Sequence, residues 1–170
     1  MSAASRAAAR ATRRTRNANK HLPARWIDVS VDDASTHAVA RAAMARRHYT
    51  PRGATIGGVA LYQYGTLARE FFSDLLSLGL FARLAGRPDG YARIAVWTEP
   101  IDGGTRVSVS LVTGVFHAAA LHATISELIQ DFAATGALIR AGEPFSGLDL
   151  PPDSPGYPLA HRRRSRARPA

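Results

Sequence analysis

The chain has 170 residues, no cysteine and a formal net charge of +9 at neutral pH. This length suits one domain of ordinary size with tails, and about 130 residues can bury an adequate core without cross-links. The lack of cysteine excludes disulfides, thiolate catalysis, zinc ribbons and iron–sulfur centres, so packing alone must hold the fold.

Residues 1–25 are expected to form a disordered basic arm. They contain seven basic side chains and no acid, and their alanine-rich stretch has high helix propensity but no apolar face. Such an arm can become helical when it binds a polyanion. Its arginine, serine and alanine content is also that of an organellar transit peptide, whereas it lacks the apolar stretch of a secretory signal.

The domain is expected to begin with a strand and a helix. In residues 25–31, large apolar residues recur at every second position, the period of a strand with one buried face. Residues 32–49 open with four side chains able to cap a helix and end with basic side chains that suit the negative end of a helix dipole. A turn at 50–53 then leads into a second strand.

Three further elements are expected before residue 91. Residues 54–64 predict a strand that is weakened or bulged at Gly57 and Gly58. Residues 66–79 place apolar side chains on one arc and polar ones on the other, which predicts an amphipathic helix. Residues 80–85 then predict a strand.

The next part of the chain has the clearest local pattern. Residues 91–114 contain two apolar runs joined by a Gly-Gly turn, which predicts a β-hairpin with one buried face. Residues 117–136 carry an apolar stripe opposite polar side chains and stop at Gly136, which predicts an amphipathic helix covering the sheet.

Residues 141–160 are expected to be an extended segment, since five prolines exclude a helix or a central strand. Their apolar side chains are too many for a mere spacer, and extended peptides bind by placing such side chains in pockets. The segment is therefore expected to dock, either on a partner protein or on its own domain. The candidate docking residues are Phe145, Leu148, Leu150, Tyr157 and Leu159.

Positive charge returns in the tail, residues 161–170, which holds five arginines and no acid. Residues 26–160, in contrast, hold ten arginines and thirteen acids, for a net charge of −3. Charge segregated in this way is typical of arms that neutralise phosphates and release counterions. The predicted nucleic-acid-binding residues are Arg6, Arg10, Arg13, Arg14, Arg16, Lys20, Arg162, Arg163, Arg164, Arg166 and Arg168.

Nucleic acid is the expected partner of these arms, and an anionic membrane surface is less favoured. No stretch approaches the ~18 consecutive apolar residues of a membrane span, so no transmembrane segment is expected. A compositional explanation competes, because only one of the 22 basic residues is lysine and a GC-rich genome would bias drifting termini towards arginine and alanine. We expect a cytoplasmic location, with organellar targeting as the alternative.

The residues that commonly carry chemistry form no known motif. His117 and His122 are five residues apart and point about 140° away from each other on a helix, unlike a zinc-binding pair. The glycine-rich stretch 53–58 lacks the residues of a phosphate-binding loop. Glu127 and Asp131 suit acid–base work only in a cleft, and otherwise form a solvated face or pair with an arginine. No metal, cofactor or catalytic activity is expected.

One strand face carries a more specific hypothesis. Tyr91, Arg93 and Trp97 share a face opposite the apolar residues of their strand. If that face is open, two aromatic rings and a cation form a surface on which bases stack. If a helix or the proline-rich segment covers the face, these side chains are packing residues instead.

The order of elements predicts an α+β fold: an antiparallel sheet with two or three helices packed on one side, flanked by disordered basic tails. We expect residues 26–140 to form this domain. The favoured function is a non-enzymatic binding or assembly protein that contacts RNA or DNA through its termini and a protein partner through its body. The alternatives are a soluble carrier of a small hydrophobic ligand or lipid in a sheet–helix crevice, and an enzyme of unknown reaction.

Overall fold

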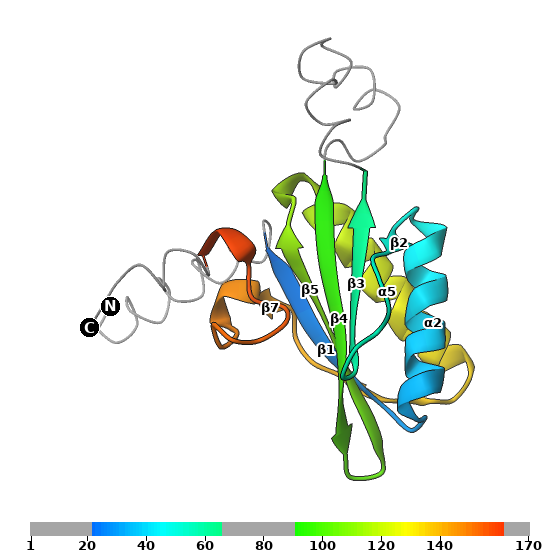
Figure 1. The fold of residues 1–170 in the computed structure, drawn as a ribbon. Coiled ribbons are helices and arrows are strands. Elements are labelled where there is room, and N and C mark those ends of the chain that lie inside the picture. Colours follow the sequence, from blue (N-terminus) through cyan, green and yellow to red (C-terminus); the bar gives the residue numbers. More distant parts are fainter. Residues whose placement is uncertain (1–21, 66–90, 162–170) are drawn as a thin grey trace, which may run out of the picture.

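The computed structural model describes residues 22–65 and 91–161, whose fold is shown in Figure 1. The helix expected over 66–79, the strand expected over 80–85 and both basic termini lie outside the described residues. The described elements are the strands β1 (Pro23–Val29), β2 (Thr50–Pro51), β3 (Val59–Tyr64), β4 (Ala92–Ile101), β5 (Gly104–Thr113), β6 (Leu138–Ala141) and β7 (Phe145–Ser146), the α-helices α2 (Asp33–Arg46) and α5 (Ala118–Ala134), and the short 3-10 helices η1 (Val115–His117) and η2 (Gly147–Asp149).

The strands form one antiparallel sheet in the order β2-β3-β4-β5-β1-β6, and β7 pairs with the beginning of β1. β1 therefore lies inside the sheet, between β5 and β6. The helices α2 and α5 both pack on one face of the sheet (Figure 1). The predicted α+β class, with helices gathered on one side of an antiparallel sheet, is confirmed.

The main core fills the space between that face and the two helices. Alternate residues of the central strands are buried there, and α5 contributes the apolar stripe that its sequence predicts. Fully burying a leucine-sized side chain contributes about 1.5–3 kcal/mol, so these residues supply most of the driving force for folding. The largest fully buried apolar side chains include Ile27, Ile94, Leu111, Leu121, Ile125, Leu128 and Phe132.

The ends of both helices follow from side chains visible in the sequence. The carboxylate of Asp32 accepts a hydrogen bond of 2.7 Å from the backbone N–H of Ser35 and caps α2. The backbone donor of Ser35 lowers the pKa of Asp32 below its usual value. After α5, Gly136 adopts a φ of 70°, which glycine tolerates without a steric penalty. The helices expected over 32–49 and 117–136 are thus present.

Gly57 and Gly58 form a tight turn, which corrects the strand expected over 54–64. Their φ angles are 56° and 71°, and Ile56 pairs with Val59 across them. Positive φ at both central residues is the geometry of a two-residue hairpin turn, which two consecutive glycines adopt readily. The strand β3 therefore begins at Val59, after the turn.

Candidate functional site

The two basic ends of the sequence are attached to one corner of the domain. The backbone N–H of Gly147 donates a hydrogen bond of 2.8 Å to the carbonyl of Leu22, the first described residue. A Cβ placed on Gly147 would lie 3.5 Å from both that oxygen and the ring of Pro158. In Figure 1 the start of β1 and the last described turn, up to His161, accordingly lie side by side.

The eleven predicted phosphate-contacting residues lie outside the described residues, but their attachment point does not. Arg25, the last basic residue of the N-terminal arm, is described and is fixed to the sheet. Its Nε donates a hydrogen bond of 2.6 Å to the carbonyl of Gly142, just after β6. The six cations before Leu22 and the five after His161 are therefore tethered to the same corner of the body.

Four charged residues form a row across the sheet face opposite the helices, which we call the second face. The strand register aligns Glu99 with Arg106, Arg106 with Asp28, and Asp28 with Arg140. The Asp28 carboxylate accepts hydrogen bonds of 2.7 Å from Arg106 Nε and 2.8 Å from Arg140 Nε. Charges of alternating sign thus run over four neighbouring strands and sum to zero.

The centre of this row is a buried carboxylate beneath an indole ring. Asp28 is 2% exposed, and its pKa is lowered chiefly by the hydrogen bond from Arg106 and further by that from Arg140, while burial opposes the shift. The guanidinium carbons of Arg106 and Arg140 lie 4.5 and 5.0 Å from the ring centre of Trp26. Because each guanidinium already has an anionic partner, this cluster suits a structural role and is poorly suited to bind an external anion.

The second face is covered in part by the end of the described chain, residues 145–161, which we call the strap. Leu150 and Leu159 of the strap pack against a small cluster on the sheet that contains Trp97. Phe145 and Tyr157 are half-buried, and Leu148 is exposed. The structure therefore places the proline-rich segment on its own domain, one of the two dockings considered from the sequence.

The face considered for base stacking is not open at Trp97. This side chain is 6% exposed, and a Cβ placed on Gly156 of the strap would lie 2.5 Å from its ring. Tyr91 and Arg93 lie together, with the guanidinium 5.3 Å from the tyrosine ring centre. Since Tyr91 is also buried, the condition for stacking is not met in this structure.

The carboxylates considered for acid–base work are partners of arginines instead. Glu127 of α5 pairs with Arg47, and Asp131 pairs with Arg46 at 2.5 Å, which ties α5 to the end of α2. All four side chains are partly exposed, so these pairs lie at the surface.

Of the histidines, His117 is fully buried, with its Nδ1 3.3 Å from the Tyr49 hydroxyl. His37 is also buried, with its Nε2 3.1 Å from the carbonyl of Gly58. Within residues 22–65 and 91–161, no group of three potential metal ligands comes together.

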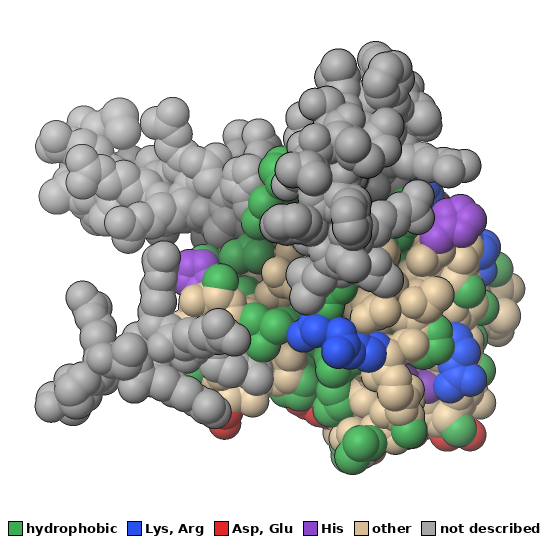
Figure 2. Space-filling view, turned by 45° about the horizontal axis from the view of Figure 1, so that its top comes forward, with side chains coloured by type: hydrophobic (Ala, Val, Ile, Leu, Met, Phe, Trp, Pro, Cys, Tyr) green, Lys and Arg blue, Asp and Glu red, His purple; other side chains and the backbone are tan. Residues whose placement is uncertain are grey.

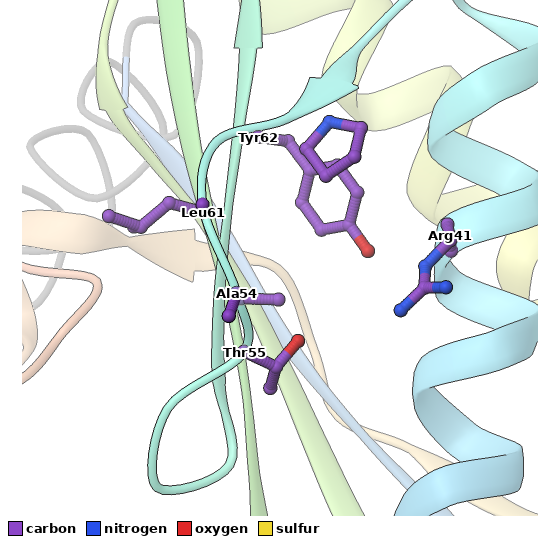
Figure 3. Close-up of a pocket in the computed structure, with 8 residues that line it drawn as sticks. Arg41, Ala54, Thr55, Leu61 and Tyr62 are labelled. Carbon is purple, nitrogen blue, oxygen red and sulfur yellow. The ribbon is translucent and has the colours of Figure 1, made fainter.

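A cavity of about 250 Å³ lies between α2 and the loop that joins β2 to β3 (Figure 3). Arg41, Thr55 and Tyr62 supply its polar lining, and Ala54 and Ala60 supply apolar lining. None of these residues was predicted from the sequence to form a site. Arg41 is one of several arginines in its helix and Thr55 lies in a turn, so no spacing in the sequence links them.

No helix of the described residues is long and apolar enough to cross a membrane. Comparison of the chain with protein-family models, with curated proteins and with solved structures found no match.

Proposed function

We propose that this protein is a non-enzymatic nucleic-acid-binding protein that contacts phosphates through its two arginine-rich ends and docks on a protein partner through its body. The observation that carries this proposal is the shared attachment corner at Leu22, Gly147 and Pro158. It tethers two segments, with six and five basic residues, within reach of the same stretch of polyanion.

Two arms on one corner bind more tightly than either arm alone. Once one arm holds a phosphate, the other meets the same molecule at a high effective concentration, and linked binding of this kind gains about 10²–10⁴ in affinity. Phosphate contacts carry no base information, so the arms bind all sequences alike.

The low net charge of the body supports the assignment of phosphate contacts to the arms. The described residues contain eight arginines against ten acids. Figure 2 shows the basic side chains on one face in separate groups among apolar and uncharged atoms. Exposed apolar side chains such as Leu148 and Ile139 are the surfaces that the body offers to a protein partner.

The test is a fluorescence-polarisation titration of the full chain with single-stranded RNA and duplex DNA, two unrelated sequences of each, from about 50 to 200 mM salt. Changing the five arginines of residues 162–168 to glutamine is expected to weaken all four complexes alike. The slope of log K against log salt should fall by up to about 0.7–0.9 for each arginine that meets a phosphate. Deleting residues 1–21 acts in the same direction.

The matched control is Arg140→Gln, which removes a cation from the body and should leave the salt slope unchanged. Separate peptides of residues 1–21 and 162–170 should each bind at least about tenfold more weakly than the chain. If the full chain has no affinity for either nucleic acid at low salt, the proposal is wrong and the arginine content reflects composition alone.

A further inference from the structure

The cavity beside α2 has the features of a binding site that is independent of the basic ends. Its lining comes from four elements of the fold: α2, β2, the loop that joins β2 to β3, and β3 itself. In Figure 3, Arg41, Thr55 and Tyr62 point towards one another across the space, while the Leu61 side chain points away from it. The polar groups therefore converge on one point.

Arg41 brings to this point a positive charge that no described residue balances. Among the described residues, no acid lines the cavity and none forms an ion pair with Arg41, unlike Arg46 and Arg47 on the same helix. An arginine remains charged at every pH at which the protein is folded. The cavity thus selects for an anion.

Tyr62 adds a neutral donor next to that charge. Its residue is 2% exposed, and burial raises the pKa of its phenol above the usual value, while the neighbouring Arg41 works in the opposite direction. The hydroxyl therefore keeps its proton and can donate to an oxygen of the ligand. Thr55, in the loop before β3, supplies a second hydroxyl to the lining.

The volume and the apolar lining of the cavity limit the size of the part of the ligand that carries no charge. Pockets for drug-sized ligands span about 300–1,000 Å³, and this cavity, at about 250 Å³, is smaller. A long acyl chain does not fit, whereas a compact ring or a short branched chain can lie against Ala54 and Ala60.

We propose that this cavity binds a small organic carboxylate. Its two oxygens accept hydrogen bonds from the Arg41 guanidinium and the Tyr62 hydroxyl, and hydrogen bonds to an ionised acceptor are stronger than those between neutral groups. Its apolar remainder faces Ala54 and Ala60. One guanidinium balances one negative charge, whereas a phosphate dianion would keep a second charge unmatched against apolar walls.

The experiment is a titration of the ¹⁵N-labelled full chain with benzoate, followed by the amide signals of residues 53–62. Saturable shifts with millimolar affinity are expected there. Benzamide, a neutral molecule of the same shape, should bind at least about tenfold more weakly because it lacks the charge that Arg41 recognises.

Two variants test the assigned roles. Arg41→Met keeps the length of the side chain and should weaken benzoate at least about tenfold, and Tyr62→Phe, which preserves the ring, should weaken it by about two- to tenfold. Arg46→Met removes a cation from the same helix outside the cavity and is the matched control. Its affinity for benzoate should equal that of the unaltered chain.

Three results with benzoate and inorganic phosphate would overturn the proposal, and so would a fourth with decanoate. The first three are no saturable shift with benzoate, equal binding of benzoate by Arg41→Met, and tighter binding of inorganic phosphate than of benzoate. Tighter binding of decanoate at the same residues would favour a lipid carrier instead and would likewise contradict it. Deleting residues 1–21 should not affect benzoate binding, so this test is separate from that of nucleic-acid binding.

Discussion

The hydroxyl of Ser110 donates a hydrogen bond of 2.8 Å to the carbonyl of Gly156, although 46 residues separate them in the chain. Both residues are buried. A Cβ on Gly156 would meet the Trp97 ring at 2.5 Å and Ser110 Cβ at 2.8 Å, so only glycine lets the strap lie this close to the sheet. The strap is therefore part of the folded domain.

Replacing Gly156 with alanine should lift the strap from the second face. The added methyl group overlaps the Trp97 ring, and overpacking of this kind costs about 1–3 kcal/mol. Amide hydrogen exchange in residues 147–158 should become faster, while exchange in α5 stays slow. Asp153→Ala, at an exposed position of the same strap, is the control and should leave exchange unchanged.

Asp28→Asn should destabilise the protein by roughly 2–4 kcal/mol at about pH 7, because it removes the buried anion that two arginines share. Urea unfolding measures the effect. Arginines are too strongly basic to lose their charge when the carboxylate is removed. The folded state of the variant therefore keeps two guanidinium charges without their anionic partner. An unchanged midpoint would show that the row of charges contributes nothing to stability.

Asp28 should also make the stability of the protein depend on pH in the acid range. The pKa of Asp28 is lowered in the folded state, chiefly by the hydrogen bond from Arg106. Its contribution is therefore complete above its unfolded pKa of about 4 and is lost as the pH falls below that value. The stability difference between the unaltered chain and Asp28→Asn should shrink from about pH 4 downwards. A difference that stays constant as the pH falls well below about 4 would contradict this role of Asp28.

The buried phenol of Tyr49 should make the protein less stable at high pH. Burial raises the pKa of this phenol to about 12, with a smaller effect of Tyr64 in the same direction. Above pH ~10 only the unfolded state ionises, so stability should fall by roughly 2–3 kcal/mol as the pH rises towards ~12. Urea unfolding of Tyr49→Phe should show a shallower decline. A decline as steep as that of the unaltered chain would contradict the assignment.

The ion pairs between α2 and α5 should matter little to stability. Arg47→Met is expected to shift the midpoint of urea unfolding only slightly, since the side chains of Arg47 and Glu127 are 42% and 30% exposed and surface ion pairs contribute little to stability. Salt near 1 M should remove the difference. The double variant with Glu127→Gln isolates the interaction of the pair, and a midpoint shift for Arg47→Met as large as that for Asp28→Asn would show that the pair is more than a surface contact.

The local elements could be predicted because their signals lie within a few residues. Asp32 caps α2 through Ser35, three residues on, and Gly136 ends α5 with the left-handed φ that a glycine permits. For the stretch 53–58 the sequence predicted a bulge or a turn without deciding between them, because two glycines mark both equally well. Only the pairing of Ile56 with Val59 decides between them.

The candidate sites could not be predicted, since each depends on strand register or on contacts between distant segments. Asp28 meets Arg106 and Arg140 through pairings with two different strands. Arg41 lies on α2 and Tyr62 on β3, and they line one cavity only because the fold brings these two distant segments together. The strap has no helical or strand period, so its sequence predicted docking without indicating the surface.

The contact that Gly147 makes with both Leu22 and Pro158 also bears on how the chain can be rearranged. Because the two ends of the described chain meet there, a short peptide joining residue 161 to residue 22 would turn the domain into a closed ring of elements. New ends could then be opened at the exposed β4–β5 turn, between Asp102 and Gly103, without cutting a buried segment. In such a permuted chain the basic arms would be attached at the opposite end of the sheet. Comparing the two chains would show whether the arms act through their charge alone or also through the place at which they are attached.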